Sequence, residues 1–364
     1  MRKSLLAIVA CAMFPQWSAG ADYKITVVAE NLDFPWSLAF LPNGELLVTE
    51  RNGGLRMIRD GQVIDYSIAG VPEALVKGQG GLLDVLVDPD FATNELIYVA
   101  YAAGTPSSNA LEVIRGRLDG STLYDVTTIL SVTPRKGTPH HYGGRMAFMP
   151  DGTLLITSGE GFDYREQAQQ KDSLMGKVLR IHTDGSVPVD NPFVSYDDAR
   201  DEIFTYGHRN PQGIAVASDG TVWMHEHGPK GGDELNRLVA GANYGWPAVS
   251  HGVNYTGEYV SPFTEAPGME DPVVVWVPSI APAGLAIYEG DAFPDWTGNL
   301  FVAALVEKSV RRLVLDSNGE VVEQDIMFTE LDQRIRDVRV GPDGHLYLLS
   351  DSSPGTIYRI HPSE

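Results

Sequence analysis

The sequence predicts an all-β protein, a six-bladed β-propeller with four-stranded blades. A turn followed by a short β-type run recurs from end to end, and no long helical period interrupts this recurrence. The 364 residues include 38 glycines and 23 prolines, which indicates many turns and short strands. A β-sandwich would not explain six internally similar units, so a propeller is favoured.

The repeated unit is clearest at Leu41–Gly44, where Leu-Pro-Asn-Gly precedes the β-type run Glu45–Val48. Asn-Gly and Asp-Gly pairs suit tight turns because these residues tolerate positive φ. Further copies of the turn begin at Pro150, Ser218, Asp295 and Pro342, with a weaker copy at Asp90. The copies lie about 46 to 78 residues apart, a spacing that suits four-stranded blades with loops of variable length.

The longest stretches rich in proline and glycine, 244–257 and 262–272, are interpreted as loops between strands rather than as linkers between domains. In a propeller such loops gather on one face around the central channel, where a functional site is expected. One further segment, Arg165–Leu174, could form a short helix within a loop.

Residues 1–21 are predicted to be a secretory signal peptide, which leaves 22–364 as a single catalytic propeller domain. A basic start precedes the apolar run Leu5–Phe14, and small residues precede the expected cleavage near Ala21. The run is too short to span a bilayer, so no stable membrane insertion is expected. The mature protein is expected to be periplasmic or secreted. The single cysteine, Cys11, leaves open a second interpretation, a lipoprotein-type site that carries a lipid anchor.

The charge balance is strongly acidic, with 48 acidic and 27 basic residues and a formal net charge of −21. Such a surface repels nucleic acid and anionic membranes, so neither is an expected partner. It suits local binding of divalent cations, although solubility alone explains most of the charges.

Three segments between the β units carry side chains that suit proton transfer or ligand binding. Gln79 lies among glycines that allow close backbone approach, and its amide is both donor and acceptor. His140–Arg145 places two histidines beside a glycine pair, and an imidazole can act as a general base near neutral pH. Glu160 follows a β-type run, where a carboxylate could orient a histidine. A flexible turn, a loop-capping histidine and a solvated carboxylate are the structural alternatives.

Two arginine motifs indicate an anionic ligand. Within Gly207–Gly213, Arg209 and Asn210 place a rigid fork of donors beside a neutral amide, which favours an anionic or quinoid ligand. At strand spacing, Arg334 and Arg336 point to one face, and their like charges repel unless an anion lies between them. Side chains that cap their own loop, and solvated arginines at a strand edge, are the alternatives.

The segment His225–Asn236 carries oxygen donors. Its two histidines hint at zinc, but their spacing does not match the helical pair of the common zinc hydrolases. Asp233 and Glu234 are hard oxygen donors, and the turn at Gly228 and Pro229 could offer backbone carbonyls. These are calcium-type ligands. A solvated acidic turn is the alternative.

Taken together, these segments resemble the soluble pyrroloquinoline quinone (PQQ) dependent aldose sugar dehydrogenases, a group within the glucose/sorbosone dehydrogenase family. The resemblance runs from Phe34 to Ile360, nearly the whole mature chain. The most specific segments, in the order and spacing of the family, are Gly207–Gly213, Glu226–Pro229, Asp233–Asn236 and Gly241–Pro247.

The resemblance implies a quinoprotein that oxidises aldose sugars at C1 to the lactone, with PQQ and Ca²⁺ as cofactors. It implies that His141 is the general base, that Glu160 orients it, and that Arg209 stabilises charge on the quinone. The implied PQQ-binding residues are Gln79, Arg209, Asn210, Arg334 and Arg336. The implied Ca²⁺ ligands are Gly228 and Pro229 beside PQQ, with Glu234 and Tyr244 at a second, structural ion. An aldose substrate and an unidentified electron acceptor are the expected partners.

Some positions depart from the better-known glucose dehydrogenases of the family. Glu160 stands where they have aspartate, and His227 stands where they have glutamine. A cofactor-binding lysine would fall near Lys308, but the match is off by one residue and is not assigned. The loops are shorter, which suggests a more open pocket and a broad range of aldoses, including oligosaccharides.

Two other functions remain as alternatives: a Ca²⁺-dependent lactonase-type propeller hydrolase, and a non-catalytic propeller that binds a glycan or a protein. A hydrolase gives no reason for Arg334 beside Arg336, or for His141 with Arg209. A degenerate, non-catalytic copy is expected to have lost one of these residues, and this chain keeps them all.

Overall fold

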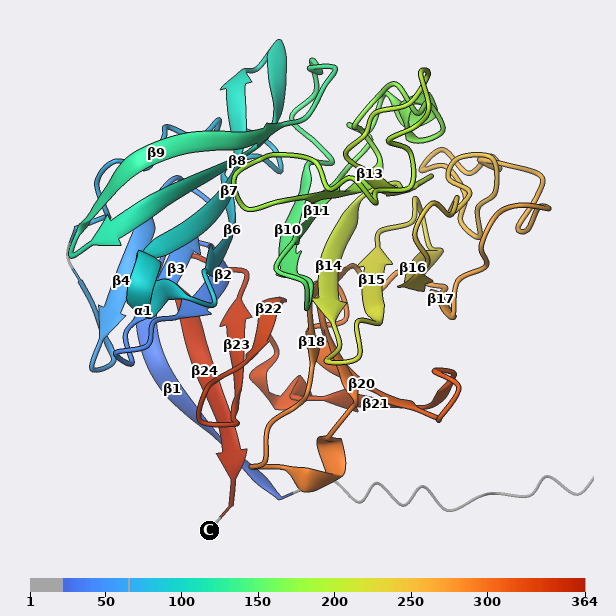
Figure 1. Cartoon of the computed structure of the whole chain (residues 1–364). Coiled ribbons are helices and arrows are strands. Elements are labelled where there is room, and N and C mark those ends of the chain that lie inside the picture. Colours follow the sequence, from blue (N-terminus) through green and yellow to red (C-terminus); the bar gives the residue numbers. More distant parts are fainter. Residues whose placement is uncertain (1–21, 65, 364) are drawn as a thin grey trace, which may run out of the picture.

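Six four-stranded sheets surround a central axis in the residues that the computed structural model describes, 22–64 and 66–363. Figure 1 shows one strand of each sheet near the centre and the others further out. The predicted six-bladed propeller with four-stranded blades is therefore confirmed. The predicted signal peptide lies outside the described residues and stays a prediction.

Each of the first five blades takes its strands in chain order from the centre outward. Blade one consists of β2 (Pro35–Phe40), β3 (Leu46–Glu50), β4 (Leu55–Arg59) and β5 (Gln62–Val63). Blade two consists of β6 (Leu82–Val87), β7 (Leu96–Thr105), β8 (Ser108–Asp119) and β9 (Thr122–Ser131). Blade three consists of β10 (Gly143–Phe148), β11 (Leu154–Ser158), β12 (Lys177–Ile181) and β13 (Ile203–Tyr206). Blade four consists of β14 (Pro211–Val216), β15 (Val222–Glu226), β16 (Asp233–Leu238) and β17 (Val274–Trp276). Blade five consists of β18 (Pro282–Ile287), β19 (Leu300–Ala304), β20 (Ser309–Leu315) and β21 (Val321–Met327).

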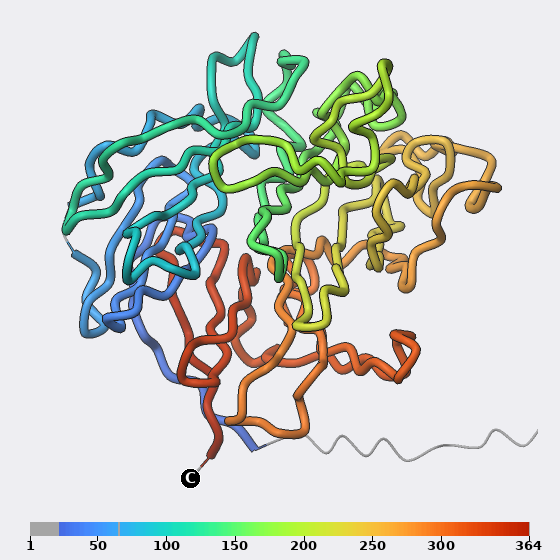
Figure 2. The backbone as a smooth tube through the Cα atoms, in the orientation of Figure 1, coloured from blue at the N-terminus to red at the C-terminus, as the bar shows by residue number. Residues whose placement is uncertain are grey.

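The sixth blade joins the two ends of the chain. Its inner strands are β22 (Ile335–Val340), β23 (Leu346–Ser350) and β24 (Gly355–Pro362), and its outermost strand is β1 (Tyr23–Leu32). β1 pairs antiparallel with β24, from Tyr23 opposite Pro362 to Leu32 opposite Gly355. Figure 2 shows the blue and red ends of the tube lying together in this blade. The ring is thus closed by main-chain hydrogen bonds between its first and last strands.

The repeated turn joins the innermost strand of a blade to the second strand. In the first blade, the Leu41 amide donates to Glu45 O (2.8 Å) and the Gly44 amide donates to Leu41 O (3.0 Å). Gly44 has a φ of 88°, a left-handed conformation that glycine adopts without a steric penalty. The weaker copy in the second blade contains a one-turn helix, α1 (Phe91–Asn94), instead of the tight turn. The sequence repeat therefore identified the same structural position in every blade.

Other helical structure in the described residues is short. The segment Arg165–Leu174, where a short helix was expected, contains only the 3-10 helix η1 (Arg165–Ala168). Two more 3-10 turns, η2 (Pro294–Trp296) and η3 (Thr329–Leu331), lie in the last two blades. Within the described residues, no helix has the length and apolar character needed to cross a membrane.

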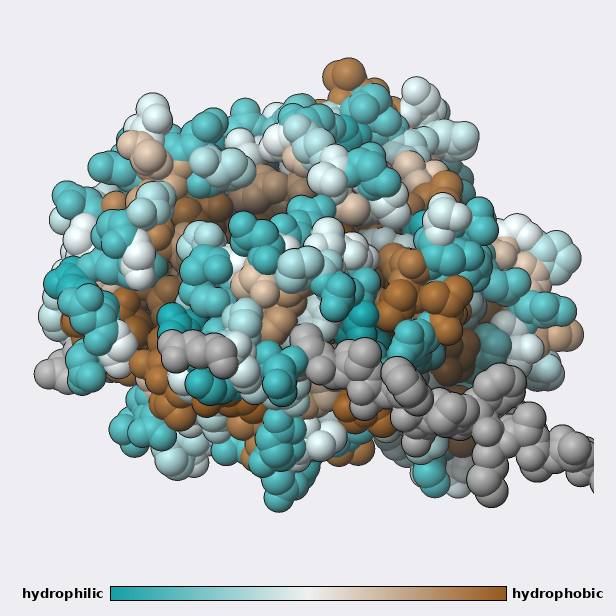
Figure 3. Space-filling model, turned by 90° about the horizontal axis from the view of Figure 1, so that it is seen from below, coloured by the Kyte–Doolittle hydropathy of each residue, from teal (hydrophilic) through white to brown (hydrophobic). Residues whose placement is uncertain are grey.

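Neighbouring blades pack through their apolar faces. Trp36 from the first blade, Tyr98 from the second and Leu179 from the third are buried in one cluster. Each such buried side chain stabilises the fold by about 1.5 to 3 kcal/mol. The face in Figure 3 is mostly hydrophilic, with apolar patches between the polar side chains.

Four charged side chains cross the axis between the innermost strands. Arg339 donates to Asp84 (2.7 Å) and to Asp337 (2.8 Å), and Arg145 lies 3.0 Å from Asp337. They come from β6, β10 and β22, so they connect three blades. We call these four residues the axial ion network. Its two positive and two negative charges balance, which is what buried charges require.

Candidate active site

The loops that enter the innermost strands meet the loops that leave the second strands at one end of the axis. His141 precedes β10, Arg209 precedes β14, and Glu160 and His227 follow β11 and β15. The fold therefore gathers the polar segments that the sequence singles out, although they lie far apart along the chain. This end of the propeller is the candidate active site.

His141 and Glu160 form a buried pair at this site. The Nδ1 atom of His141 lies 3.1 Å from Glu160 Oε1, and both side chains are buried. Within the described residues, Nε2 of His141 makes no hydrogen bond. An ionised Glu160 would accept the Nδ1 proton, which leaves a lone pair on Nε2. The expected orientation of the histidine by Glu160 has this geometric support.

Burial shifts both members of the pair toward their neutral forms. It lowers the pKa of His141 well below its usual value, and the charges of Arg209 and His227 lower it further. Burial also raises the pKa of Glu160 to about 7, although Arg209 and Lys136 oppose the rise. His141 is therefore neutral at physiological pH, and Glu160 changes its charge near neutrality.

A buried lysine holds the loop that carries His141. Lys136 Nζ donates to Thr138 O (2.8 Å) and to His140 O (2.7 Å), and it lies 3.4 Å from the centre of the Tyr142 ring. Gln79 reinforces the loop because its Oε1 accepts the His141 amide (2.7 Å). His141 itself has a φ of 50°, an uncommon conformation for a residue with a side chain. These contacts fix the position of its imidazole.

Three arginines surround a cavity of about 220 Å³, which we call the arginine cavity. Its lining includes Tyr142 and Gly143, the two residues that follow His141. Its charged lining consists of Arg51, Arg334, Arg336 and Asp351. The net charge of this group is positive, so the cavity suits a ligand that carries several negative charges. Gln79, Trp36, Asn210 and His227 also line it.

Arg334 and Arg336 do share one face, but a protein carboxylate lies between them. Asp351 accepts from Arg334 Nε (3.1 Å) and from Arg336 Nη2 (3.0 Å). Burial alone would raise the pKa of Asp351, but the charges of Arg336 and Arg334 hold this pKa below its usual range. The inference that two arginines require an anionic ligand was therefore too strong on its own. Asp351 cancels only one of the two positive charges, and Arg51 adds a third.

The four residues expected to bind Ca²⁺ line a second, small cavity, which we call the carbonyl cavity. It measures about 10 Å³, close to the space of a single water molecule or ion. Its lining includes Gly228, Pro229, Glu234 and Tyr244. The two pairs expected at separate ions thus lie at one cavity. His227 lines both this cavity and the arginine cavity.

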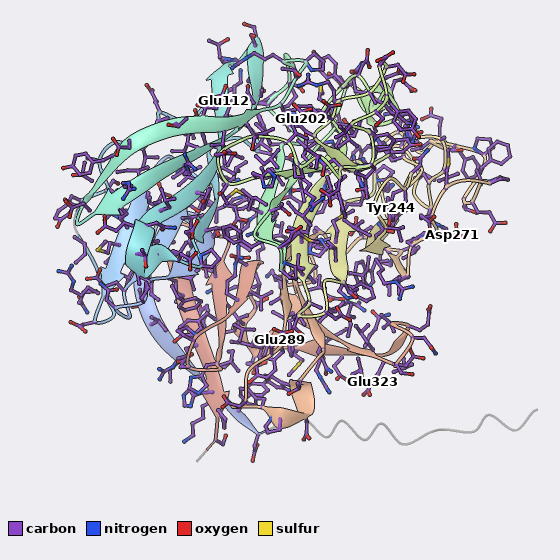
Figure 4. The ribbon with its side chains drawn as sticks, in the orientation of Figure 1. Glu112, Glu202, Tyr244, Asp271, Glu289 and Glu323 are labelled. Carbon is purple, nitrogen blue, oxygen red and sulfur yellow. The ribbon has the colours of Figure 1, made fainter. Side chains whose placement is uncertain are left out.

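Two carboxylates, Glu226 and Glu234, line the carbonyl cavity. Glu226 lies directly opposite Glu234 across β15 and β16. Burial raises the pKa of Glu234 well above its usual value, and the Glu226 charge raises it further. The hydroxyl of Tyr244, labelled in Figure 4, donates to Arg237 O (2.8 Å), so only its carbonyl oxygen is left for a ligand. The Gly228 carbonyl accepts from Arg209 Nη1 (2.6 Å).

The family model described as Glucose / Sorbosone dehydrogenase matches residues 32–359 of this propeller. The chain belongs to the glucose/sorbosone dehydrogenase family. Aldose sugar dehydrogenase YliI of Escherichia coli strain K12 is 42% identical over 361 residues, which cover 97% of this chain and 96% of that protein. The predicted family and the predicted class of enzyme, a sugar dehydrogenase, are confirmed.

Solved structures of sugar dehydrogenases match nearly the whole propeller. The apo-form of the soluble aldose sugar dehydrogenase from Escherichia coli has a TM-score of 0.90 at 40% identity, covering 94% of this chain and 100% of that one. The PQQ-bound form of aldose sugar dehydrogenase from Streptomyces coelicolor has a TM-score of 0.75 at 28% identity, covering 94% and 99%.

For this member of the glucose/sorbosone dehydrogenase family, sequence reasoning missed three residues that the structure brings to the site. Arg51, Asp351 and Lys136 lie in segments that contain no motif, and only the propeller brings them beside the motif residues. Lys308, which was left unassigned, pairs with Asp332 (2.8 Å) and is absent from the lining of the arginine cavity. Charged residues near strand ends were the available signal, but strand ends are too numerous to single these out.

Metal binding by side chains alone has no support in this site. Within the described part of the chain, no three His, Cys, Asp or Glu side chains are grouped to hold a metal ion. His227 Nε2 lies 2.6 Å from Pro282 O, which accepts its proton, so this nitrogen is not a metal ligand. A metal in the carbonyl cavity would depend on backbone carbonyls, which suits Ca²⁺ better than zinc.

Proposed function

We propose that the protein is a Ca²⁺-dependent PQQ enzyme that oxidises aldose sugars at C1 to the lactone, with His141 as the general base. The observation that carries this proposal is a buried imidazole paired with Glu160, in a loop whose next two residues, Tyr142 and Gly143, line a cavity with three arginines. The family and the sugar dehydrogenases that match the chain support the same reaction class.

The arginine cavity fits PQQ, a planar quinone with three carboxylates. Arg51, Arg334 and Arg336 supply positive charge that Asp351 only partly neutralises. Planar guanidinium groups bind carboxylates through paired hydrogen bonds. Asn210 and Gln79 add amide groups at the same cavity. We assign these residues, together with Arg209, to cofactor binding.

The carbonyl cavity fits Ca²⁺. Its lining combines carboxylates with backbone carbonyls, the hard oxygen donors that this ion prefers. A cation there would also relieve the repulsion between Glu226 and Glu234, which lie opposite each other. The Gly228 carbonyl, which would help to hold the ion, accepts from Arg209 Nη1 in this structure.

Each residue has a definite part in the proposed reaction. Nε2 of His141 takes the proton from the C1 hydroxyl of the sugar, and Glu160 stabilises the imidazolium through Nδ1. Arg209 would stabilise the negative charge that a bound quinone gains during the reaction. PQQ, when bound, supplies the two-electron acceptor for the hydride that leaves C1, and Ca²⁺ supplies further charge stabilisation.

The proposal includes a location and a partner. The signal-like residues 1–21 support a periplasmic or secreted protein. The acceptor that reoxidises the cofactor would be a separate molecule, because the sequence has no haem-attachment motif.

Reconstitution tests the proposal directly. Metal-free apoprotein is mixed with PQQ, with and without Ca²⁺, and dye reduction is followed with glucose. We expect activity only when both are added. The absence of PQQ binding in absorbance spectra would overturn the proposal, and lactone hydrolysis with Ca²⁺ would then be measured.

Substitution of the base tests the catalytic assignment. We expect His141→Ala to bind PQQ normally and to lower kcat by about 100-fold or more, because only proton transfer is removed. Spectroscopic PQQ titration and dye reduction give the two readouts. An equal loss of PQQ affinity and of rate would contradict the assigned role.

A further inference from the structure

Two aromatic side chains extend outward from the catalytic imidazole. The Phe162 ring lies 5.2 Å from the His141 ring, between centroids, and meets it edge to face at 75°. The Tyr255 ring lies 6.4 Å beyond Phe162 and is nearly parallel to it, at 26°. We call Phe162 and Tyr255 the aromatic row. It starts at the atoms proposed to react and ends at the surface.

Both side chains of the aromatic row are exposed to solvent, whereas large apolar side chains usually pack in the core. Phe162 is 37% exposed and Tyr255 is 63% exposed, whereas His141 is buried. Phe162 also has a φ of 71°, a left-handed conformation that is unfavourable for a bulky residue. Such strain persists where the surrounding structure holds it, and it concentrates at ligand-binding positions.

Two separate loops hold the aromatic row in place. Phe162 lies in the loop after β11, and Tyr255 lies in the long connection between β16 and β17. Arg165 Nη1 joins these loops by donating to Asn254 Oδ1 (3.3 Å). Gly161 precedes Phe162, and a Cβ there would lie 2.6 Å from Lys136 Cδ, so the close approach needs glycine. The row is therefore tied to the same lysine that holds the His141 loop.

We propose that the aromatic row binds two successive sugar rings of a reducing gluco-oligosaccharide. This inference rests on the proposed function. Phe162 would contact the ring whose C1 is oxidised, and Tyr255 would contact the next ring. The Phe162 and Tyr255 centroids lie 6.4 Å apart, so the two side chains can each contact a different ring of one oligosaccharide.

The chemistry of the row suits a sugar with equatorial hydroxyls. Such rings expose C–H groups on both faces, and these faces pack against the flat apolar surface of an aromatic ring. Nearly parallel rings would support a chain of sugars that runs in one direction from the catalytic centre. A 4-linked disaccharide such as cellobiose meets these requirements, because its second ring continues away from C1 of the first.

Kinetics with two sugars test the proposal. Dye reduction is measured with glucose and with cellobiose for the PQQ- and Ca²⁺-loaded wild type, Tyr255→Ala and Phe162→Leu. We expect Tyr255→Ala to raise KM for cellobiose about tenfold more than KM for glucose. Phe162→Leu is expected to raise KM for both sugars. Tyr259→Ala, at an 81% exposed residue of the same connection, is the matched control and should leave the ratio of the two KM values as in the wild type.

A binding measurement separates this proposal from the proposed function. Calorimetric titration with methyl cellobioside, which cannot be oxidised at C1, gives Kd for the wild type and for Tyr255→Ala without turnover. Weaker binding by the variant supports the aromatic row even if no sugar is oxidised, an outcome that would defeat only the proposed function. Equal Kd values would overturn the row. A changed KM for the electron acceptor, with the sugar constants unaltered, would overturn it in favour of an acceptor-docking surface.

Discussion

At the scale of single residues, the site depends on titratable side chains whose burial favours their neutral forms. Glu160 is held largely neutral below about pH 7, yet its proposed task requires the ionised form. Once ionised, it fixes the Nδ1 tautomer of His141 and leaves Nε2 free to accept a proton. The rate at this site is therefore expected to follow the charge of the orienting acid rather than that of the base.

The first prediction concerns pH. As pH falls through about 7, Glu160 gains a proton, whereas His141 stays neutral because its pKa is well below its usual value. We expect kcat to fall on the acid side of neutrality in the wild type. Glu160→Gln should be slower at high pH by about tenfold or more and should lose this limb, since an amide does not titrate. Profiles of kcat across about pH 5 to 9 test this; an acid limb that survives in the variant would assign it to another group.

The second prediction concerns the arginines. Removing Arg334 and Arg336 together takes away two charge-assisted contacts to a ligand carboxylate, and leaves Asp351 without its partners. We expect PQQ affinity to fall by about 100-fold or more, since each such contact is typically worth about 1.5 to 3 kcal/mol. Absorbance titration measures it. Lys308→Ala is the control, because Lys308 pairs with Asp332 and is absent from the cavity lining. Unchanged affinity in the double variant would reject the assignment of the cavity.

At the scale of elements, loops carry the chemistry and strands place the loops. His141, the proposed base, lies in a loop whose carbonyls at Thr138 and His140 accept hydrogen bonds from Lys136. Burial lowers the pKa of this lysine to about 7, and its ammonium group still donates to both carbonyls. Lys136 thus holds two carbonyls of the short segment between β9 and β10, in addition to the contact from Gln79.

The third prediction concerns this lysine. Lys136→Met keeps the length of the side chain but leaves the two carbonyls without a donor, so the His141 loop should loosen. We expect kcat to fall by about tenfold or more while PQQ affinity changes less. Lys171→Met is the matched control, because Lys171 also lies over aromatic rings but away from His141. Equal effects of the two substitutions on kcat would show that Lys136 has no special part in positioning the base.

Much of the fold and part of the site could be predicted from the sequence, for definite reasons. The turn at Leu41–Gly44 and its copies are local patterns, so they identified the blades without knowledge of the fold. The segments around His141 and Arg209 were dense enough in polar residues to stand out. Arg51 and Asp351 did not, because neither lies in a polar motif. Arg51 reaches Arg334 and Arg336 only across the ring of blades, and Asp351 meets them only because β22 and β23 pair. The aromatic row was missed for the same reason, since two loops form it.

At the scale of the whole molecule, the axis is filled by charge rather than by apolar side chains alone. The axial ion network joins β6, β10 and β22 below the site. Arg145 also donates to the carbonyl oxygen of Arg336 (3.1 Å), a residue of the arginine cavity. Its guanidinium lies 3.9 Å from the centre of the Trp36 ring, which lines the same cavity. The network therefore supports the floor of the proposed cofactor site.

The fourth prediction concerns this network. Arg339→Met removes one of its two positive charges and leaves Asp84 and Asp337 buried with an excess of negative charge. We expect the free energy of unfolding to fall by about 3 to 5 kcal/mol, the usual cost of breaking a buried ion pair from one side. Denaturant titration measures the change. Arg117→Met, at an exposed arginine with a distant partner, is the control and should alter stability by less than about 1 kcal/mol. A similar small loss for Arg339→Met would mean that the network adds little to stability.

The pairing of β1 with β24 sets the order in which the ring can be completed. Of the described strands, β1 is made first during synthesis and its partner β24 is made last. Earlier blades can form hairpins as they emerge, but the ring cannot be fastened until the final strand arrives. The contact that completes the ring therefore spans the greatest distance along the chain. While a ribosome or a translocation channel still holds the last strand, β24 cannot pair with β1. The ring therefore closes only after the end of the chain is released.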